Sequence, residues 1–288
     1  MPDQATPAPS EPGKVLRGGE FYSPVRGRLS AGDVVLSELR QPCSRSVPRH
    51  EHELAYITVV LQGNYLEGDR GHLEEFRPLT AVFNPEGVAH STVIGPAGAS
   101  FFTVEFRAAG IRALDLRPPQ ETTFDPGVGT MLWPGLRLFS AFKAQVADPL
   151  VLEGYVCELL GAITGLRSEE WSRARKAPSW LARVKDRLHA DFRQPVRLKD
   201  LAREAGVHPV HLARAFRRFE GQTAGEYLHR LQARAACELL RDPDWTLAAI
   251  AAECGFADQS HFTRIFRRMT ATTPSQFRKL VVAGKTAA

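Results

Sequence analysis

The sequence predicts a multidomain α+β protein: an N-terminal antiparallel β-barrel with following helices, and an all-α C-terminal domain built from two helix-turn-helix copies. Three observations predict this class. Short segments rich in β-branched and aromatic residues dominate residues 20–107, apolar residues at helical spacing begin near residue 129, and the C-terminal part repeats itself at an offset of 50 positions. The chain has 288 residues, enough for two domains with separate cores.

The composition excludes several classes of protein. Apolar residues make up 43% of the chain and charged residues 24%, as in an ordinary water-soluble domain. No run approaches the ~20 apolar residues that a membrane helix needs, and the N-terminus lacks the apolar stretch of a secretory signal. The four cysteines (Cys43, Cys157, Cys237 and Cys254) form no CxxC pair, which argues against a disulfide framework and a cysteine zinc site. We therefore expect a cytoplasmic protein that is not bound to a membrane.

The first half of the chain is predicted to be a barrel. Residues 1–18 are rich in proline and poor in large apolar residues, so we expect a disordered tail there. Within residues 19–110, glycine, proline, asparagine and aspartate separate short strand-like segments, which are Asp33–Leu39, Leu54–Leu61, Leu79–Phe83 and Ser100–Phe106. Short strands at regular spacing are typical of an antiparallel sandwich or barrel.

Residues 111–171 are predicted to form a helical segment. Apolar residues recur there at steps of three and four positions, namely Leu152, Val156, Leu159, Leu160, Ile163 and Leu166. One continuous stripe, which consists of Tyr155, Leu159, Ile163 and Leu166, either covers the barrel or pairs with a second copy of the chain. Residues 172–178 are polar and lack apolar periodicity, so we expect a linker there.

Residues 179–288 contain one unit in two copies, at 198–219 and 247–269. Each copy consists of a short helix, a glycine and a second helix, and Gly206 and Gly255 stand where the chain must leave the first helix. This order is typical of a helix-turn-helix.

Side chains that can cap helices mark several helix starts in this part. Thr223 and Thr273 each open an S/T-x-x-E/Q capping box, and Thr246 can cap the first helix of the second copy. Arg197 occupies the equivalent position in the first copy, where it is a poor cap. We therefore expect a less rigid start for the first copy.

The positive charge is concentrated in the C-terminal part. Residues 172–288 carry 22 Lys and Arg against 11 Asp and Glu, a net charge of +11, whereas residues 1–171 have a net charge of −6. A basic module joined to an acidic one is typical of a polyanion-binding domain that is fused to another function. A solvated basic face without a partner is the alternative, and the doubled unit favours double-stranded DNA.

The outer face of the second helix in each copy holds the candidate DNA contacts. The apolar stripes face the core, which leaves outside Val210, His211, Ala213, Arg214, Arg217 and Arg218 in the first copy and Gln259, Ser260, Thr263, Arg264, Arg267 and Arg268 in the second. Arg214 and Arg264 occupy matched positions, and an arginine can bind guanine O6 and N7 bidentately. We expect the other four arginines to hold phosphates or to remain solvated.

Residues 180–280 resemble the double helix-turn-helix domain of AraC/XylS-type bacterial transcription regulators. The resemblance is carried by Leu198-x-x-Leu-Ala, Gly206, Ile250-Ala-x-x-Cys-Gly-Phe256, Asp258-Gln-Ser-His-Phe262, Phe266-Arg-Arg268 and Thr273-Pro-Ser-Gln-Phe-Arg278. It implies a transcription regulator, often an activator that contacts RNA polymerase, whose second helices enter the major groove. It also places dimer contacts in the helices after the barrel, so we favour a homodimer, which doubles the contacts to DNA. Arg197 and Pro209 depart from the family pattern and leave the operator sequence open.

Two short motifs in the N-terminal half resemble the two motifs of cupin barrels. His50-x-His52 precedes a strand, and Pro85-x-Gly-x-x-His90 contains a turn. The resemblance implies a cupin-like barrel that senses a small-molecule effector, and we expect the effector to contact His50, His52, Tyr56 and His90. The glutamate that metal-binding cupins carry after the first motif is missing, because Tyr56 and Ile57 stand in its place.

The three histidines leave the role of a metal open. We expect His50, His52 and His90 to converge from strand beginnings at one end of the barrel, where neutral imidazoles can bind Zn²⁺ or another divalent ion with water in the open position. Hydrogen bonding at the barrel rim, or contact with an organic effector, is the alternative that we favour. Glu105 and Tyr65 are further polar candidates among apolar strand positions.

Three other functions compete with a ligand-responsive regulator. A cupin metalloenzyme fused to a DNA-binding domain is disfavoured by the missing glutamate and by the lack of another acid–base cluster. A DNA-repair methyltransferase of AraC-like type needs clustered cysteines, and the four here are scattered. A regulator that senses nothing and acts through its abundance alone stays open, as do the effector and the target genes.

Overall fold

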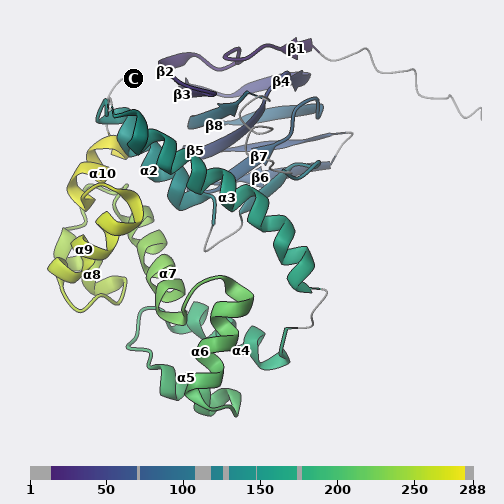
Figure 1. Ribbon diagram of the computed structural model, residues 1–288. Coiled ribbons are helices and arrows are strands. Elements are labelled where there is room, and N and C mark those ends of the chain that lie inside the picture. Colours follow the sequence, from purple (N-terminus) through teal and green to yellow (C-terminus); the bar gives the residue numbers. More distant parts are fainter. Residues whose placement is uncertain are drawn as a thin grey trace, which may run out of the picture.

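The computed structural model describes residues 14–69, 72–107, 118–125, 130–146, 148–173 and 177–282. It confirms the multidomain α+β class. A bent β-sheet forms the N-terminal part, two helices cover one side of it, and the C-terminal part is helical (Figure 1). In the described parts of the chain, none of the helices combines the length and the hydropathy that crossing a membrane requires.

The sheet is built around two long strands that pair with each other along most of their length. The described strands are β1 (Lys14–Leu16), β2 (Val25–Ala31), β3 (Val34–Gln41), β4 (Arg45–His52), β5 (Ala55–Asp69), β6 (His72–Phe76), β7 (Ala81–Asn84), β8 (His90–Phe106) and β9 (Thr123–Asp125). β8 pairs with β5 on one side and with β3 and β4 on the other, while β5 also pairs with β6 and β7. The parallel pair β1–β4 is the exception in an otherwise antiparallel sheet, and no pairing between described strands closes it into a full barrel.

Two glycines allow the long strands to bend. The β5–β8 register shifts between Val60 and Gln62 and again between Gly63 and Tyr65. Gly63 and Gly98 both adopt φ +70°, and a Cβ on Gly63 would collide with the backbone of Gly98. Because of this bend, the two halves of β5 and β8 enclose a space between the sheet layers.

Two predictions about the N-terminal part need correction. Residues 14–18 are not part of a disordered tail, because Lys14–Leu16 pair with β4; residues 1–13 lie outside the described residues. His50 and His52 precede β5 as predicted, but they do not lie at strand beginnings, since both belong to β4 and His52 ends it. Of the three histidines, His90 alone begins a strand.

The helices after the barrel are α2 (Leu132–Lys143) and α3 (Pro149–Arg173). Leu159 and Ile163 of α3 are fully buried and belong to one core with Trp133 and Phe139 of α2. Tyr155 packs against this core, and the side chain of Leu166 lies outside the described residues. The stripe therefore covers the chain's own core, and Leu159 and Ile163 cannot also form a dimer contact.

The C-terminal helices follow the predicted repeat. They are α4 (Ser179–Asp191), α5 (Leu198–Ala205), α6 (Pro209–Glu220), α7 (Ala224–Leu239), α8 (Leu247–Glu253), α9 (Gln259–Thr270) and α10 (Pro274–Val282). α5–α6 and α8–α9 are the two helix-turn-helix copies, and Gly206 and Gly255 have φ of +69° and +76°. The capping box at Thr223 and the cap at Thr246 form as predicted, and the Arg197 side chain makes no cap hydrogen bond.

The two copies have different neighbours. The first copy packs with α4 and the start of α7 in a core of its own. The second copy shares a continuous core with α2, α3 and the sheet, and α9 packs against α2 (Figure 1). Two polar contacts join the same surfaces: Arg137 Nε donates to Met269 O at 3.1 Å, and the Gln62 amide donates to Val281 O.

Candidate functional site

The second helix of each copy starts at a fixed point and buries a regular apolar stripe. His208 caps α6 through the Val210 N–H at 3.3 Å, and Asp258 caps α9 through the His261 N–H at 2.7 Å. Leu212 and Phe216 of α6 are fully buried, as are Phe262 and Phe266 of α9. Because these side chains take up the inner face, the remaining side chains must point outward.

The predicted contact residues of α9 come together on one surface. Arg264, Arg267 and Arg268 are exposed and Thr263 is half-buried, with its hydroxyl donating to Gln259 O at 2.8 Å. A surface groove is lined by Gln259, Ser260, Thr263, Arg264, Arg267, Arg268 and Thr273. The structure therefore brings together all six residues that the sequence singles out in the second copy.

Arg268 differs from Arg264 in having a partner within the protein. Its Nη2 lies 3.3 Å from Nδ1 of His229 on α7, so the guanidinium is directed along the helix pair. Burial, followed by the charge of Arg268, lowers the pKa of His229, which favours the neutral ring that accepts this bond. Arg268 is thus held at a fixed place beside the groove.

The first copy presents the matching face on α6. Val210, His211, Ala213, Arg214, Arg217 and Arg218 are all exposed, as predicted. Val210 is 52% exposed at the start of the helix, an unusual place for a branched apolar side chain.

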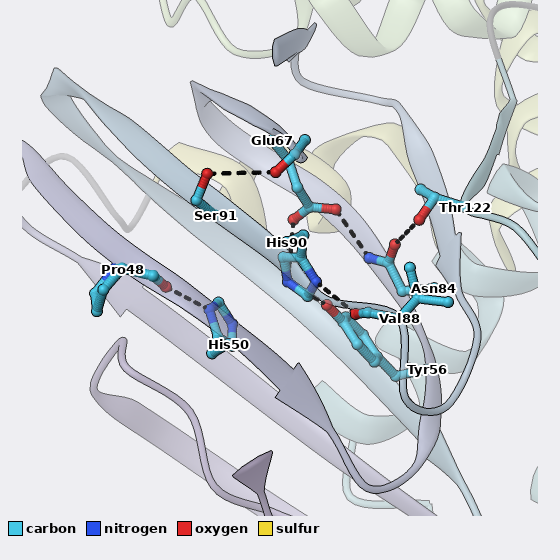
Figure 2. A network of polar contacts seen from close by, with 10 residues as sticks. Pro48, His50, Tyr56, Glu67, Asn84, Val88, His90, Ser91 and Thr122 are labelled. Atoms are coloured by element: carbon cyan, nitrogen blue, oxygen red, sulfur yellow. Dashed lines mark hydrogen bonds and ion pairs between the residues drawn. The ribbon is translucent and has the colours of Figure 1, made fainter. Parts of the chain in front are cut away.

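A second site lies inside the bent sheet, where the three predicted histidines converge; Figure 2 shows two of them, His50 and His90. His50 and His52 come from β4 and His90 from the start of β8, and all three are buried. One ring nitrogen of each lies within 4.8 Å of the others. Pro48 helps to place them, because it cannot donate to the ladder and the β4–β8 register shifts between Val47 and His50.

Backbone carbonyls fix the tautomers of two of these histidines. His50 Nδ1 donates to Pro48 O at 2.9 Å, and His90 Nδ1 donates to Val88 O at 3.2 Å (Figure 2). Each Nε2 is therefore left as the lone-pair atom, and the Tyr56 hydroxyl donates to that of His90 at 3.2 Å. His52 Nδ1 is buried and has no hydrogen-bond partner among the described residues.

Burial keeps the three imidazoles neutral. Desolvation lowers the pKa of His50, His52 and His90, and the neighbouring histidines lower it further for His50 and His52. For His52 the pKa falls to about 3. At neutral pH the cluster therefore offers lone pairs and not positive charge.

One acidic residue of this site, Glu67 on β5, is missing from the sequence-based set. It is buried, and its Oε2 lies 3.9 Å from His90 Nε2. Asn84 Nδ2 donates to Glu67 Oε1 at 3.0 Å, and Thr122 Oγ1 donates to Asn84 Oδ1 at 2.8 Å (Figure 2). Burial raises the pKa of Glu67 to about 7.

The histidines line one end of a small cavity of about 70 Å³. The polar lining consists of the three histidines, Glu67, Tyr56, Tyr65, Thr58, Thr92, Thr103, Tyr22 and Ser23, and the apolar lining includes Phe21, Leu39, Val47, Ile94 and Phe101. Tyr56 thus lies where the effector is expected. Glu105 does not line this cavity, because its carboxylate accepts the Gly19 N–H at 2.8 and 3.0 Å.

Comparison with known proteins decides the family. A model of the helix-turn-helix domain matches residues 201–280. The probable transcription factor PqrA of Proteus vulgaris is 36% identical over 84 residues, which are 29% of this chain and 69% of that protein. The chain belongs to the AraC family of transcription regulators.

Two further relatives of this AraC-family regulator differ in how much of it they cover. The uncharacterized regulator YijO of Escherichia coli is 20% identical over 268 residues, which are 88% of this chain and 91% of YijO. The activator RhaR of Escherichia coli is 35% identical over 94 residues, so the match spans 33% of each protein. A solved structure of a probable AraC-family regulator from Rhodopseudomonas palustris covers 36% of this chain and 98% of its own at 24% identity, with a TM-score of 0.34.

Proposed function

We propose that this AraC-family regulator activates transcription by binding duplex DNA through the outer faces of α6 and α9, under the control of a small ligand in the β-sheet pocket. One observation carries the proposal: two capped helices present matched, exposed basic faces in a part of the chain with a net charge of +11. It works in the cytoplasm, where the DNA and RNA polymerase that it contacts are found.

The arginines on these faces have two different roles: some contact base edges and others contact backbone phosphates. Arg214 and Arg264 occupy the matched outer positions near the helix starts, from which an arginine reaches a guanine edge. Arg217, Arg218, Arg267 and Arg268 lie nearer the helix ends and hold the backbone phosphates. The fixed partner of Arg268, His229, suits a contact that positions the protein without reading sequence.

One strand separates the ligand pocket from the helix that touches α9. Tyr56 and Thr58 of β5 line the pocket, while the alternate residues Ile57 and Val59 belong to the core shared with α2. Gly135 lets α2 sit close to the strand, since a Cβ there would lie 2.7 Å from the Val59 side chain. A ligand that moves β5 therefore displaces α2 and, with it, the attached second copy.

The pocket senses and does not catalyse. Its volume of about 70 Å³ is small beside the ~300–1,000 Å³ of pockets that hold organic substrates. Two copies of the chain act together at a symmetric operator, which doubles the contacts to DNA. Leu150, 76% exposed, and Val151, 38% exposed, lie at the start of α3 and are apolar candidates for this contact.

The test is a reporter driven by the promoter next to the regulator's own gene, combined with a mobility-shift assay on the same DNA. The full chain is expected to shift this DNA and to raise reporter expression. The double substitution Arg214→Ala/Arg264→Ala should abolish both effects, while Arg26→Ala/Arg183→Ala, on β2 and α4, removes the same charge and serves as the control. The proposal is wrong if the double variant binds and activates like the unaltered chain.

A further inference from the structure

We propose that the ligand of the pocket is a divalent transition-metal ion, bound by ring nitrogens of His50, His52 and His90, with the Glu67 carboxylate facing its remaining coordination position. The inference rests on the proposed function only in treating the pocket as the sensing site. It names the chemical class of the ligand and adds an acidic residue that neither sequence motif contains.

The distances suit a shared ion. The three ring nitrogens lie within 4.8 Å of one another. Nitrogens bound to a tetrahedral ion at ~2.0–2.1 Å are about 3.3 Å apart, so each pair needs to close by about 1.5 Å at most. Small rotations of buried rings supply such a movement without a change in the strands.

The hydrogen bonds around the cluster are those of metal-binding histidines. A ligating histidine almost always donates its second ring N–H to a carbonyl or carboxylate, which fixes the tautomer and directs the lone pair at the metal. Pro48 O and Val88 O play this part for His50 and His90. These two rings are therefore oriented with Nε2 available for an ion.

His52 supplies an independent observation. The residue is 5% exposed, and its Nδ1 has no partner among the described residues. A buried polar nitrogen without a partner destabilises the folded state, so such atoms need a reason. The His52 ring is centred 5.1 Å from that of His50 and 5.6 Å from that of His90, so an ion between the rings is within its reach.

Glu67 supplies the negative charge that a buried cation needs. It is the one acidic residue among those that line the cavity. Asn84 holds Oε1, and Oε2 is the oxygen 3.9 Å from His90 Nε2. Three neutral imidazoles leave the charge of a divalent ion uncompensated in a site shielded from water, and one adjacent carboxylate halves it.

The size and the donor atoms of the cavity select the kind of ligand. Pockets for organic effectors usually measure about 300–1,000 Å³. The cavity here has about 70 Å³, enough for an ion and one or two waters. Imidazole nitrogens favour Zn²⁺, Co²⁺, Ni²⁺ or Cu²⁺ over Ca²⁺ and Mg²⁺, which prefer oxygen ligands.

The surface provides an approach to the site. Glu67 and His90 also line a second depression of about 260 Å³, together with Asp69, His72 and Glu74. The same two residues thus border the inner cavity and this depression, which contains three carboxylates, one of them (Asp69) paired with Arg49. A cation gathered there reaches the histidines by passing Glu67.

The experiment uses the full chain prepared without a metal-affinity tag and stripped with a chelator. Zn²⁺ is titrated against a competing chelator, and Co²⁺ binding is followed by its visible absorption, which reports the coordination number and geometry of the ion. We expect one ion per chain. His52→Gln and His90→Gln should weaken binding by more than 100-fold and Glu67→Gln by about 10–100-fold, whereas the exposed control Glu121→Gln should leave it unchanged.

Thermal unfolding separates loss of the site from loss of the fold. The stripped variants should melt cooperatively, and Zn²⁺ should raise the melting temperature of the unaltered chain but not that of His90→Gln. The inference is overturned if the unaltered chain binds well below one equivalent, or if the histidine variants bind as it does. Should no ion bind while an organic compound alters DNA binding, the metal site is wrong and the proposed function stands. Should the ion bind at this site without altering DNA binding, the metal site stands and its sensing role fails.

Discussion

Arg264 and Arg268 lie on the same helix, but their surroundings differ. Arg264 is exposed on the groove, while Arg268 is held by His229 at 3.3 Å. We predict that Arg264→Ala relaxes base preference at one operator position and costs roughly 1–3 kcal/mol there. Arg268→Ala should weaken all sequences about equally and reduce the slope of log K against log salt by about one. Competition binding with operator and scrambled DNA measures both, and equal losses on the two DNAs for both variants would contradict the division of roles.

The histidine cluster gives a second prediction at the level of single residues. His90→Gln removes the Nε2 lone pair that faces Glu67 and Tyr56, and His90 belongs to β8 and not to α6 or α9. Promoter activity in cells should therefore stop responding to added zinc or chelator, while the affinity of the purified variant for operator DNA stays within about twofold of the unaltered chain. A variant that keeps a normal zinc response shows that the cluster is not the sensor.

The residues of this site differ in how far the sequence alone could predict them. The alternation of His50 and His52 and the turn before His90 predict their convergence. No sequence motif predicts that Glu67 belongs to this site. Its approach to His90 depends on the β5–β8 register, in which Glu67 pairs with Thr92 only after two bulges. A motif describes local spacing, whereas Glu67 reaches the site through strand pairing.

Helix caps provide a prediction at the level of elements. α5 starts at Arg197 without a side-chain cap, and a positive charge there opposes the helix dipole. We predict that Arg197→Ser stabilises the protein by about 0.5–1 kcal/mol, and that Thr246→Ala, at the matched position of the second copy, destabilises it by about 1 kcal/mol. Urea unfolding measures both values. No gain from Arg197→Ser would mean that the backbone at this position already satisfies the helix start.

The elements were predicted with unequal success, and their composition explains why. α6 and α9 combine strong apolar periodicity with clear boundaries, so the sequence places them closely. β4 reads Arg-Ser-Val-Pro-Arg-His-Glu-His and has one buried apolar side chain, Val47, so it carries almost no strand signal. Its membership in the sheet comes from pairing with β8 and β1.

In the whole molecule, the N-terminal sheet shares a core with the second helix-turn-helix copy, whereas the first copy has a core of its own. Arg137 on α2 binds Met269 O of α9 and Glu158 of α3. In the unaltered chain, we expect Zn²⁺ to change operator affinity by the 5- to 150-fold that is typical of coupled sites. We predict that Zn²⁺ leaves the operator affinity of the Arg137→Ala variant almost unchanged. Lys143→Ala, which breaks the pair with Glu38 at the other end of α2, is the matched control and should leave the change intact. If the Arg137→Ala variant keeps the full change in operator affinity, this contact does not couple the pocket to α9.

Nothing in the sequence indicates this contact between the domains. The face of α9 that meets α2 contains residues that also complete the helix-turn-helix core, such as Met269. Apolar periodicity alone does not distinguish a residue that packs within its own domain from one that packs against α2. The docking depends on the shapes of two finished surfaces. For this reason the fold class and the exposed faces of α6 and α9 could be predicted, but the packing between the two parts could not.

The central claim is that α6 and α9, which lie on either side of α7 in the chain, bind DNA on one face of the duplex. Hydroxyl-radical footprinting of the full chain on its operator tests it most directly. The account predicts two protected segments about one helical turn, ~34 Å, apart for each chain, with Arg214→Ala weakening one segment and Arg264→Ala the other. A single protected segment that is lost with Arg264→Ala and unaffected by Arg214→Ala would contradict it.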